Sequence, residues 1–216
     1  MTRTLNARAI LFDMDGTIVD STATVEHVWG RFADTHGVSL ETILGDSHGI
    51  KAVDTIRKYG PEGIDADAAA ADIAAYEINL LDGIVEIPGA AAFVSALTDA
   101  QFALVTSAPR DLGIVRLNHC GIPLPSVIVG AEDVTHGKPD PEPYLSGARQ
   151  LGIDPADCVV FEDAPAGIRA GLAAGMRVVV VGAVDDPVAE GLPRIHDYRF
   201  ARVEQGDGGA FTIVLP

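Results

Sequence analysis

The stretch that decides the fold is Ala9-Ile10-Leu11-Phe12-Asp13-Met14-Asp15-Gly16-Thr17, in which an unbroken apolar run ends in two carboxylates and a glycine. Continuous apolarity, rather than alternation, is typical of a strand buried on both faces, as in a parallel sheet. None of the later runs with the same character leads into a hairpin turn. These runs are 102–105, 127–129, 158–161 and 178–181. We therefore expect a parallel sheet whose first strand is 9–12.

Helical patterns lie between these runs, at about 89–99, 110–119, 141–151 and 165–174. Strand followed by helix, repeated along the chain, builds βαβ units. The predicted fold class is α/β, with a doubly wound (Rossmann-like) parallel sheet core. Two further strand patterns, 198–203 and 211–214, flank a glycine-rich turn, and we expect them to extend or cover an edge of the sheet.

One segment departs from this alternation, because residues 21–86 contain no strand pattern and are rich in alanine. The simplest interpretation is a small α-helical cap inserted after the first strand. We predict an α/β catalytic core of residues 1–19 and 87–216 and a helical cap domain of residues 20–86, with a hinge where the chain crosses between them. Helix breaks inside the cap are expected at Gly37, Gly45, Gly60-Pro61 and Gly83.

Composition and charge narrow the class of protein. Of the 216 residues, 48% are hydrophobic and 21% are charged, which is enough apolar material for a sizeable core and excludes a disordered chain. Lys and Arg number 15 against 31 Asp and Glu, so the formal net charge is −16. This acidic balance disfavours nucleic acid as a partner, because a phosphodiester backbone is repelled. An anionic substrate would need a local cation.

The cysteines and the hydropathy pattern indicate the cellular compartment of the protein. Cys120 and Cys158 match no metal-ligand spacing, and we expect two buried thiols in a reducing compartment. Residues 1–9 contain no apolar signal-sequence core. No run approaches the roughly 18 apolar residues of a membrane span. The sequence therefore predicts a cytoplasmic protein without a membrane partner, present as a monomer or a weak dimer.

Polar clusters follow the predicted strands at the points where each strand ends. Because the carboxyl ends of parallel strands share one edge of the sheet, we expect these clusters to converge there. The cluster residues are Asp13 and Asp15, Thr106 and Ser107, Lys138, and Glu162 and Asp163.

The four carboxylates of this set form an oxygen-rich group that suits Mg²⁺, and they would repel one another without a cation. Lys138 is the cation that a phosphate would need in addition, although a solvated surface lysine remains the alternative. Thr106 and Ser107 precede a predicted helix, where a hydroxyl and free N–H groups form either a phosphate cradle or an ordinary helix cap.

The motif from Phe12 to Ser21 resembles the first motif of the haloacid dehalogenase superfamily. Three further motifs of that family match in order: Thr106, Lys138 within Gly-Lys-Pro-Asp-Pro, and Glu162-Asp163 within Glu-Asp-Ala-Pro-Ala-Gly. The resemblance is strongest to the branch that holds sugar- and polyol-phosphate phosphatases and β-phosphoglucomutase. It covers most of the chain, including the cap.

This resemblance implies a role for each core residue. Asp13 is the nucleophile that forms an aspartyl-phosphate, and Asp15 is the general acid and then the general base. Mg²⁺ is held by Asp13, Asp15 through its backbone carbonyl, Asp163 and Glu162. Thr106, Ser107 and Lys138 bind the phosphate.

The cap motif His48-Gly49, Lys51 and Thr55-Ile56-Arg57 resembles that of sugar- and glycerol-phosphate phosphatases. His48, Lys51 and Arg57 are thus candidates for contacting the substrate. Helix-surface charges and a turn histidine are the alternative interpretation.

The leading hypothesis is a Mg²⁺-dependent phosphatase that acts on a small phosphorylated sugar or polyol. A phosphomutase of the β-phosphoglucomutase type is the first alternative; mutases usually carry an apolar residue where Thr17 stands, which favours the phosphatase. A signalling receiver domain shares an acidic cluster, a hydroxyl and a lysine, but the helical insert and the Asp-x-Asp spacing disfavour it. A binding protein without activity is disfavoured because every motif residue is present.

Overall fold

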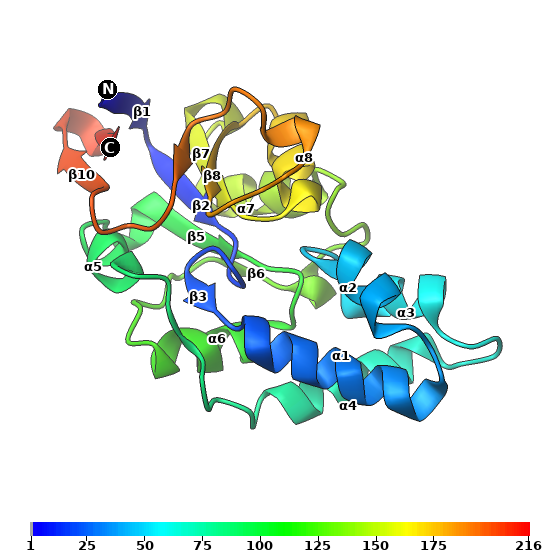
Figure 1. The fold of residues 1–216 in the computed structure, drawn as a ribbon. Coiled ribbons are helices and arrows are strands. Elements are labelled where there is room, and N and C mark those ends of the chain that lie inside the picture. The colour runs from blue at the N-terminus through cyan, green and yellow to red at the C-terminus, as the bar shows by residue number, and fades with distance from the viewer. Residues whose placement is uncertain (1) are drawn as a thin grey trace.

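The computed structural model describes residues 2–216, and a parallel β-sheet lies at its centre (Figure 1). Within these residues the sheet has six strands in the order β6-β5-β2-β7-β8-β9, and all neighbouring pairs run parallel. The strands are β2 (Ala9–Phe12), β5 (Phe102–Val105), β6 (Ile128–Val129), β7 (Cys158–Glu162), β8 (Arg177–Val181) and β9 (Arg194–Ile195). The predicted α/β doubly wound core is confirmed, and β9 is a strand that the sequence pattern did not predict.

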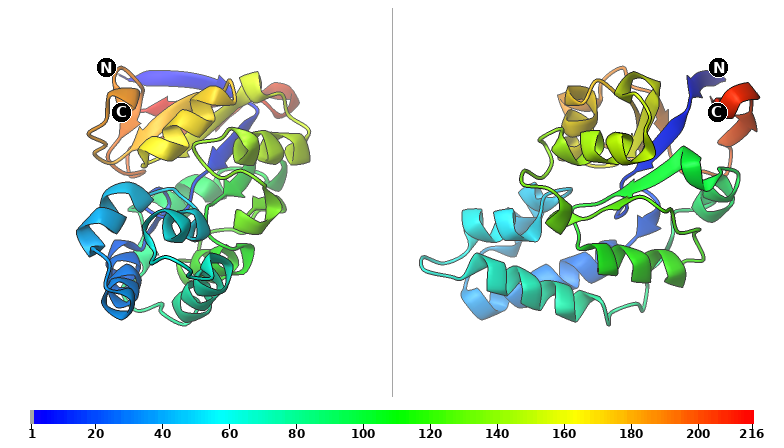
Figure 2. Two further views of the ribbon diagram at one scale, coloured as in Figure 1. Left: turned by 90° about the vertical axis from the view of Figure 1, so that its right-hand side faces the viewer. Right: turned by 180° about the vertical axis from the view of Figure 1, so that it is seen from behind.

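Helices cover both faces of the sheet, because successive residues of a strand point to opposite sides. In β2, Ile10 and Phe12 join one apolar cluster, while Ala9 and Leu11 join a second. The helices of the two layers lie on opposite sides of the sheet (Figure 2). The first cluster takes residues from α5 (Ala90–Ser95) and α6 (Arg110–His119), and the second from α7 (Glu142–Leu151) and α8 (Pro165–Ala173).

The register of the central strands decides which loops meet. Phe12 of β2 lies opposite Leu104 of β5 and Phe161 of β7. The loops that leave these three strands therefore begin at the same level on the carboxyl edge of the sheet, which is where open α/β sheets bind ligands.

Residues 20–86, which we call the cap, form a helical unit with an apolar cluster of its own, built around Trp29, Phe32, Ile43 and Ile56. None of these side chains belongs to the two clusters of the sheet. The rest of the chain is called the core. The cap helices are α1 (Thr22–His36), α2 (Leu40–Ser47), α3 (Ala52–Tyr59) and α4 (Ala66–Glu77).

The chain enters and leaves the cap through a short antiparallel ribbon of β3 (Val19–Asp20) and β4 (Val85–Glu86). Val19 lies opposite Glu86, and Asp20 lies opposite Val85. The two crossings between core and cap are thus paired with each other in one ribbon.

The prediction of a helix break at Gly45 is wrong, because α2 continues through this residue to Ser47. A single glycine inside a helix costs only about 1 kcal/mol relative to alanine. The helix begins normally, with Ser39 accepting a hydrogen bond from the N–H of Thr42, and it ends where Gly49 takes the left-handed conformation at φ 75°. The other breaks fall between helices, as at Gly37, which caps α1 with φ 67°.

The C-terminal strands belong to a separate antiparallel sheet in the order β1-β11-β10. The side chains of Phe211, Ile213 and Leu215 enter the first core cluster. This sheet therefore packs against the core without extending the main sheet, whose last strand on one side is β9. Its strands are β1 (Arg3–Ala7), which was not predicted, β10 (Arg202–Gln205), which starts later than the predicted 198, and β11 (Phe211–Leu215).

Across residues 2–216, no helix has both the length and the apolarity that a membrane span requires. Cys120 and Cys158 are free thiols. Cys158 is buried as predicted, whereas Cys120 is only half-buried.

Candidate active site

Asp13 is the first residue after β2 and lies buried at the carboxyl edge of the sheet. Lys138 donates from Nζ to Asp13 Oδ1 at 2.6 Å and to Glu162 Oε1 at 2.7 Å. The Lys138 side chain is completely shielded from solvent between these two carboxylates. It is therefore not a solvated surface lysine, and its charge is held next to the candidate nucleophile.

Glu162 is saturated with hydrogen bonds. Its Oε1 accepts from Lys138 and from the hydroxyl of Tyr144 at 2.8 Å, and its Oε2 accepts from the backbone N–H groups of Asp163 and Ala164. Gly167 of α8 packs against the same carboxylate, because a Cβ there would come within 1.6 Å of Glu162 Oε1. Glu162 thus acts as a rigid acceptor that fixes Lys138.

The ionisation of the site follows from burial and from repulsion between carboxylates. Burial raises the pKa of Asp13 to about 7; the attraction of Lys138 opposes this shift and the repulsion of Glu162 adds to it. Burial also raises the pKa of Asp163 well above its usual range, with further repulsion from Asp13 and Glu162. Burial alone would lower the pKa of Lys138, but the attraction of the two carboxylates outweighs it and the pKa is raised.

The acidic side chains fit a divalent cation. Asp13, Glu162 and Asp163 each bring a carboxylate oxygen within 4.8 Å of the others. All-oxygen ligands suit Mg²⁺, and the raised pKa values of Asp13 and Asp163 show how costly this cluster is without a cation. Because Glu162 already accepts four hydrogen bonds, Asp13 and Asp163 are the side chains best placed to hold the ion. Asp15, predicted to hold the metal through its backbone carbonyl, has its carboxylate turned towards Arg116.

Two residues of the first motif hold Asp163 in place. Thr17 donates from Oγ1 to Asp163 Oδ1 at 2.9 Å. Gly16 adopts φ 83°, and a Cβ at this position would lie 2.0 Å from Asp163 Oδ2. Any residue other than glycine would therefore displace the carboxylate as well as strain the backbone.

Asp15 belongs to a chain of charged groups that reaches the cap. Its Oδ1 accepts from Ser21 Oγ at 2.5 Å and from Arg116 Nη1 at 2.6 Å. Arg116 Nη2 in turn donates to Glu77 Oε1 of α4 at 3.1 Å. Asp15 Oδ2 receives no hydrogen bond from any residue between 2 and 216, so this oxygen is free to exchange a proton with a bound molecule. Burial raises the pKa of Glu77, and the attraction of Arg116 opposes this shift.

The loop after β5, predicted to bind phosphate, lies beside Asp13 at the cavity. Thr106 is buried just after β5, and the N–H of Ala108 donates to its hydroxyl at 3.0 Å. Pro109, rather than Thr106, caps α6, so Thr106 is not an ordinary helix cap. The backbone N–H groups of Asp15 and Ser107 find no acceptor within the described chain. Unpaired N–H groups of this kind suit a bound anion.

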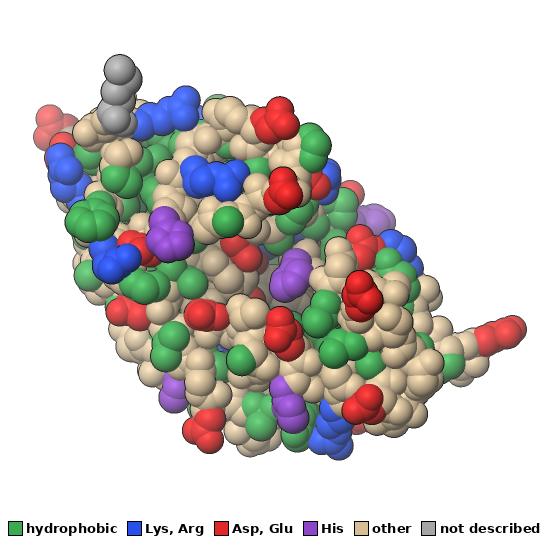
Figure 3. Space-filling model, viewed as in Figure 1, with side chains coloured by type: hydrophobic (Ala, Val, Ile, Leu, Met, Phe, Trp, Pro, Cys, Tyr) green, Lys and Arg blue, Asp and Glu red, His purple; other side chains and the backbone are tan. Residues whose placement is uncertain are grey.

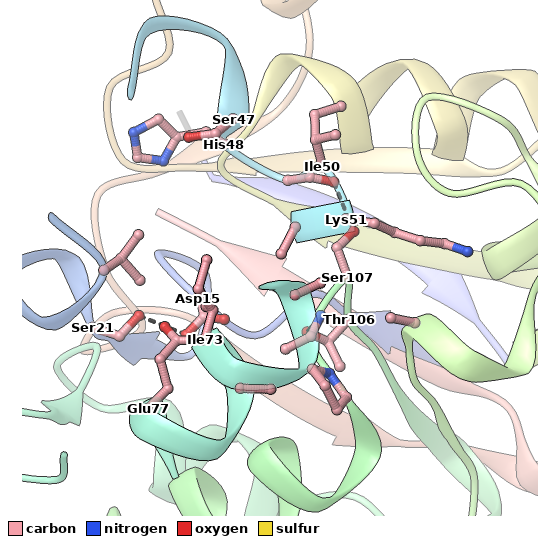
Figure 4. Close-up of a pocket in the computed structure, with 18 of the residues that line it drawn as sticks. Asp15, Ser21, Ser47, His48, Ile50, Lys51, Ile73, Glu77, Thr106 and Ser107 are labelled. Atoms are coloured by element: carbon pink, nitrogen blue, oxygen red, sulfur yellow. Dashed lines mark hydrogen bonds between the residues drawn. The ribbon is translucent and has the colours of Figure 1, made fainter. Parts of the chain in front are cut away.

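A cavity of about 270 Å³ opens over these residues, between the core and the cap. Asp13, Asp15, Asp163, Thr106 and Ser107 form its core side. The close-up shows Asp15 beside Ser21 and Glu77, with Thr106 and Ser107 across the cavity (Figure 4). Apolar side chains dominate the cap side, among them Val25, Trp29, Ile50 and Ile73. The face of the molecule shown in Figure 3 carries many acidic side chains, in line with the net charge.

The three cap residues singled out in the sequence have different positions. His48 lines the cavity. Lys51 also lines the cavity, but its side chain extends away from Asp15 and its Nζ donates to the carbonyl of Val134 at 2.7 Å (Figure 4). Arg57 is not among the residues that line the cavity; its guanidinium is half-exposed and pairs with acidic side chains on the surface of the cap.

Sequence reasoning missed Arg116, Glu77 and Tyr144. Arg116 lies on the buried stripe of α6 that includes Leu112 and Leu117, and Glu77 lies four residues after the buried Ile73 of α4. A charged residue on the apolar face of a predicted helix is a signal that could have found Arg116 and Glu77. Tyr144 gave no such signal, because a tyrosine on an apolar helix face is common in protein cores.

Known proteins resemble this chain in sequence and in fold. Residues 7–175 match the family model of haloacid dehalogenase-like hydrolases. The chain is 41% identical over 186 residues to hexitol phosphatase A of Escherichia coli, covering 84% of this chain and 86% of the relative. It is 36% identical over 193 residues to glycerol-1-phosphate phosphohydrolase 2 of Saccharomyces cerevisiae, covering 84% and 77%. A β-phosphoglucomutase from Clostridium difficile superposes with a TM-score of 0.77 at 26% identity, covering 88% and 91%.

The parallel sheet, the inserted helical cap and the acidic cluster beside a buried lysine define a hydrolase of the α/β class that acts on phosphate esters, with a Rossmann-like core. The chain belongs to the haloacid dehalogenase-like hydrolases and is a phosphatase of that family. Membership in this family excludes the signalling receiver domain.

Proposed function

We propose that the protein is a Mg²⁺-dependent phosphatase that hydrolyses a small phosphorylated polyol or sugar through an aspartyl-phosphate on Asp13. The observation that carries the proposal is the pairing of a buried nucleophile, Asp13, with a second carboxylate, Asp15, whose Oδ2 is free, both on the wall of one cavity. The relatives named for hexitol and glycerol phosphates support the substrate class.

In the proposed reaction, an Asp13 carboxylate oxygen attacks the phosphorus, and the bond between phosphorus and the ester oxygen breaks. Asp15 Oδ2 gives a proton to the departing oxygen, which leaves as an alcohol. Asp15 then takes a proton from water as the water attacks the phosphorus of the aspartyl-phosphate. Inorganic phosphate is released, and the Asp13 carboxylate is restored.

Other residues hold the phosphoryl group during both steps. The Lys138 ammonium offsets the negative charge that accumulates on the transferring oxygens. The N–H group of Ser107 and the hydroxyl of Thr106 orient those oxygens. When bound to Asp13 and Asp163, Mg²⁺ would supply further positive charge beside the phosphoryl group.

The cavity favours hydrolysis over mutase chemistry. A mutase must accommodate a sugar bisphosphate, whose second phosphate needs a cation of its own. In the described chain the basic side chains that line the cavity are His48, Lys51 and Arg116. The Lys51 ammonium is bound to a backbone carbonyl outside the cavity, and Arg116 is neutralised by Asp15 and Glu77. A largely apolar wall with one histidine and one carboxylate suits an uncharged polyol better than a second phosphate.

The experiment is phosphate release from sorbitol 6-phosphate, glycerol 1-phosphate, 2-deoxyglucose 6-phosphate and phosphoglycolate, with Mg²⁺ or with EDTA. We expect release from a polyol or sugar phosphate with Mg²⁺ and loss of it with EDTA or in Asp13→Asn. Asp207→Asn, on the exposed turn before β11, is the matched control and should keep wild-type activity. Absence of Mg²⁺-dependent release from all substrates refutes the proposal. Conversion of glucose 1-phosphate to glucose 6-phosphate with a bisphosphate activator, without free phosphate, would establish the mutase instead.

The sequence-based expectation of a cytoplasmic enzyme that is a monomer or a weak dimer remains part of this proposal. Two free thiols with raised pKa values, which burial causes, are compatible with a reducing compartment.

A further inference from the structure

Arg116 is a buried charge that connects the acid–base carboxylate to the cap. Its side chain is 1% exposed, although it carries a permanent positive charge. Taking a guanidinium out of water is costly unless carboxylates and hydrogen bonds replace the lost hydration. Two carboxylates do so here: Asp15 of the core at 2.6 Å and Glu77 of the cap at 3.1 Å.

The contact selects one oxygen of Asp15. Arg116 and Ser21 both donate to Oδ1, which leaves Oδ2 without a partner in residues 2–216. A carboxylate with one oxygen anchored twice has little freedom to rotate, so the free oxygen keeps a fixed direction. General acid–base catalysis depends on such positioning, because the proton must be within hydrogen-bond reach of the reacting oxygen.

The contact also depends on the cap. Glu77 is the last residue of α4, and the cap joins the core covalently only through the β3–β4 ribbon. If α4 moved away from the core, Arg116 would lose one of its two carboxylates while its Nε, already without a partner, stayed unpaired. The buried charge therefore favours the docked cap.

We propose that Arg116 is a positioning residue that couples cap docking, through Glu77, to the orientation of the Asp15 carboxylate. This inference rests on the proposed function only where it assigns Asp15 to proton transfer. The docking of the cap through Arg116 and Glu77 stands apart from that assignment.

The kinetic test compares two leaving groups. p-Nitrophenolate leaves without a proton, whereas the alkoxide of sorbitol 6-phosphate needs one. Because kcat/KM reports the steps up to phosphoryl transfer, a misplaced Asp15 should lower it for the polyol phosphate far more than for the aryl phosphate. We expect Arg116→Met to lower kcat/KM about 100-fold for sorbitol 6-phosphate and less than about fivefold for p-nitrophenyl phosphate.

Conservative variants keep the test informative if Arg116→Met does not fold. Arg116→Lys keeps the charge but cannot form both contacts in the same geometry. Its kcat/KM for sorbitol 6-phosphate should be about tenfold higher than that of Arg116→Met. Glu77→Gln keeps the shape but weakens a charge-assisted hydrogen bond, and it should lower kcat/KM for the polyol phosphate about tenfold. Glu204→Gln, an exposed glutamate of β10 paired with Arg202, is the matched control and should behave as wild type.

Equal losses on both substrates would mean that Arg116 has only a structural role and would overturn the proposal. Unchanged kinetics in the Arg116 and Glu77 variants would overturn it as well. Inactivity of the wild type on both substrates would instead count against the proposed function.

Amide hydrogen exchange tests cap docking without any activity. The β3–β4 ribbon and α4 should exchange at least about threefold faster in Glu77→Gln and Arg116→Lys than in Glu204→Gln, because the docked cap is less stable. Identical exchange in all variants would overturn the docking role of Arg116.

Discussion

The raised pKa of Asp13 predicts an unusual pH dependence of stability. The pKa of Asp13 is about 7 in the folded protein, mainly because of burial, against 3.8 for the unperturbed group. Between these values the folded protein keeps a proton that the unfolded chain has released. Stability therefore falls as pH rises from about 4 to about 7, and above that range the loss stays constant.

The size of this effect follows from the shift. Three pKa units correspond to roughly 4 kcal/mol at pH 8. For a chain of 216 residues, each kcal/mol changes Tm by about 2–4 °C, so the effect amounts to roughly 10 °C. Asp13→Asn removes the ionisable group but keeps an acceptor for Lys138, and it should be free of this loss.

The assay is thermal unfolding in EDTA from pH 4 to pH 8. The Tm of Asp13→Asn minus that of the wild type should be near zero at pH 4 and should reach roughly 10 °C at pH 8. Mg²⁺ at pH 8 should narrow the gap, because a cation that binds the folded state stabilises the wild type. Asp207→Asn should follow the wild type throughout. A Tm difference that does not change with pH would refute a strongly raised pKa of Asp13.

Three further changes test the packing of the site, and a fourth tests a cap helix. Lys138→Met should abolish phosphatase activity and, because it leaves two buried carboxylates unpaired, lower the free energy of unfolding by about 3–5 kcal/mol at pH 8 in denaturant titration; unchanged stability would contradict the pairing. Tyr144→Phe should lower the free energy of unfolding by about 1 kcal/mol, the net value of one hydrogen bond to Glu162. An unchanged free energy of unfolding in the same titration would show that this hydrogen bond does not contribute to stability. Gly167→Ala should destabilise by about 1–3 kcal/mol or more, because its Cβ overlaps Glu162. Gly45→Ala, which meets no atom within 4 Å inside α2, should instead stabilise by about 0.5–1 kcal/mol; a loss of Tm there would contradict the open helix surface.

Much of the fold could be predicted because its signals are local. The unbroken apolar runs at 9–12, 102–105 and 178–181 became β2, β5 and β8, since strands covered on both faces are built mainly from apolar side chains. β1 and β9 escaped prediction because β1 is mostly polar and β9 has only two residues. Gly45 was misjudged because the cost of one glycine is smaller than the gain from continuing a helix.

The residues that gather at the candidate active site could be identified from the amino-acid sequence. The motif Asp13-Met14-Asp15-Gly16-Thr17 and the distant Lys138 and Asp163 could be brought together without coordinates, because the carboxyl ends of parallel strands must meet at one edge. Their chemistry is carried by residue type and by strand order, and both can be read along the chain.

How the cap meets these residues could be seen only in the folded chain. Whether a side chain of the cap points into the cavity depends on how helices pack, which no local pattern encodes. His48 lies at the cavity, Lys51 directs its charge to a backbone carbonyl, and Arg57 stays on the surface. The same packing brought Glu77 to Arg116 and Arg116 to Asp15, because a buried guanidinium must find its carboxylates in three dimensions.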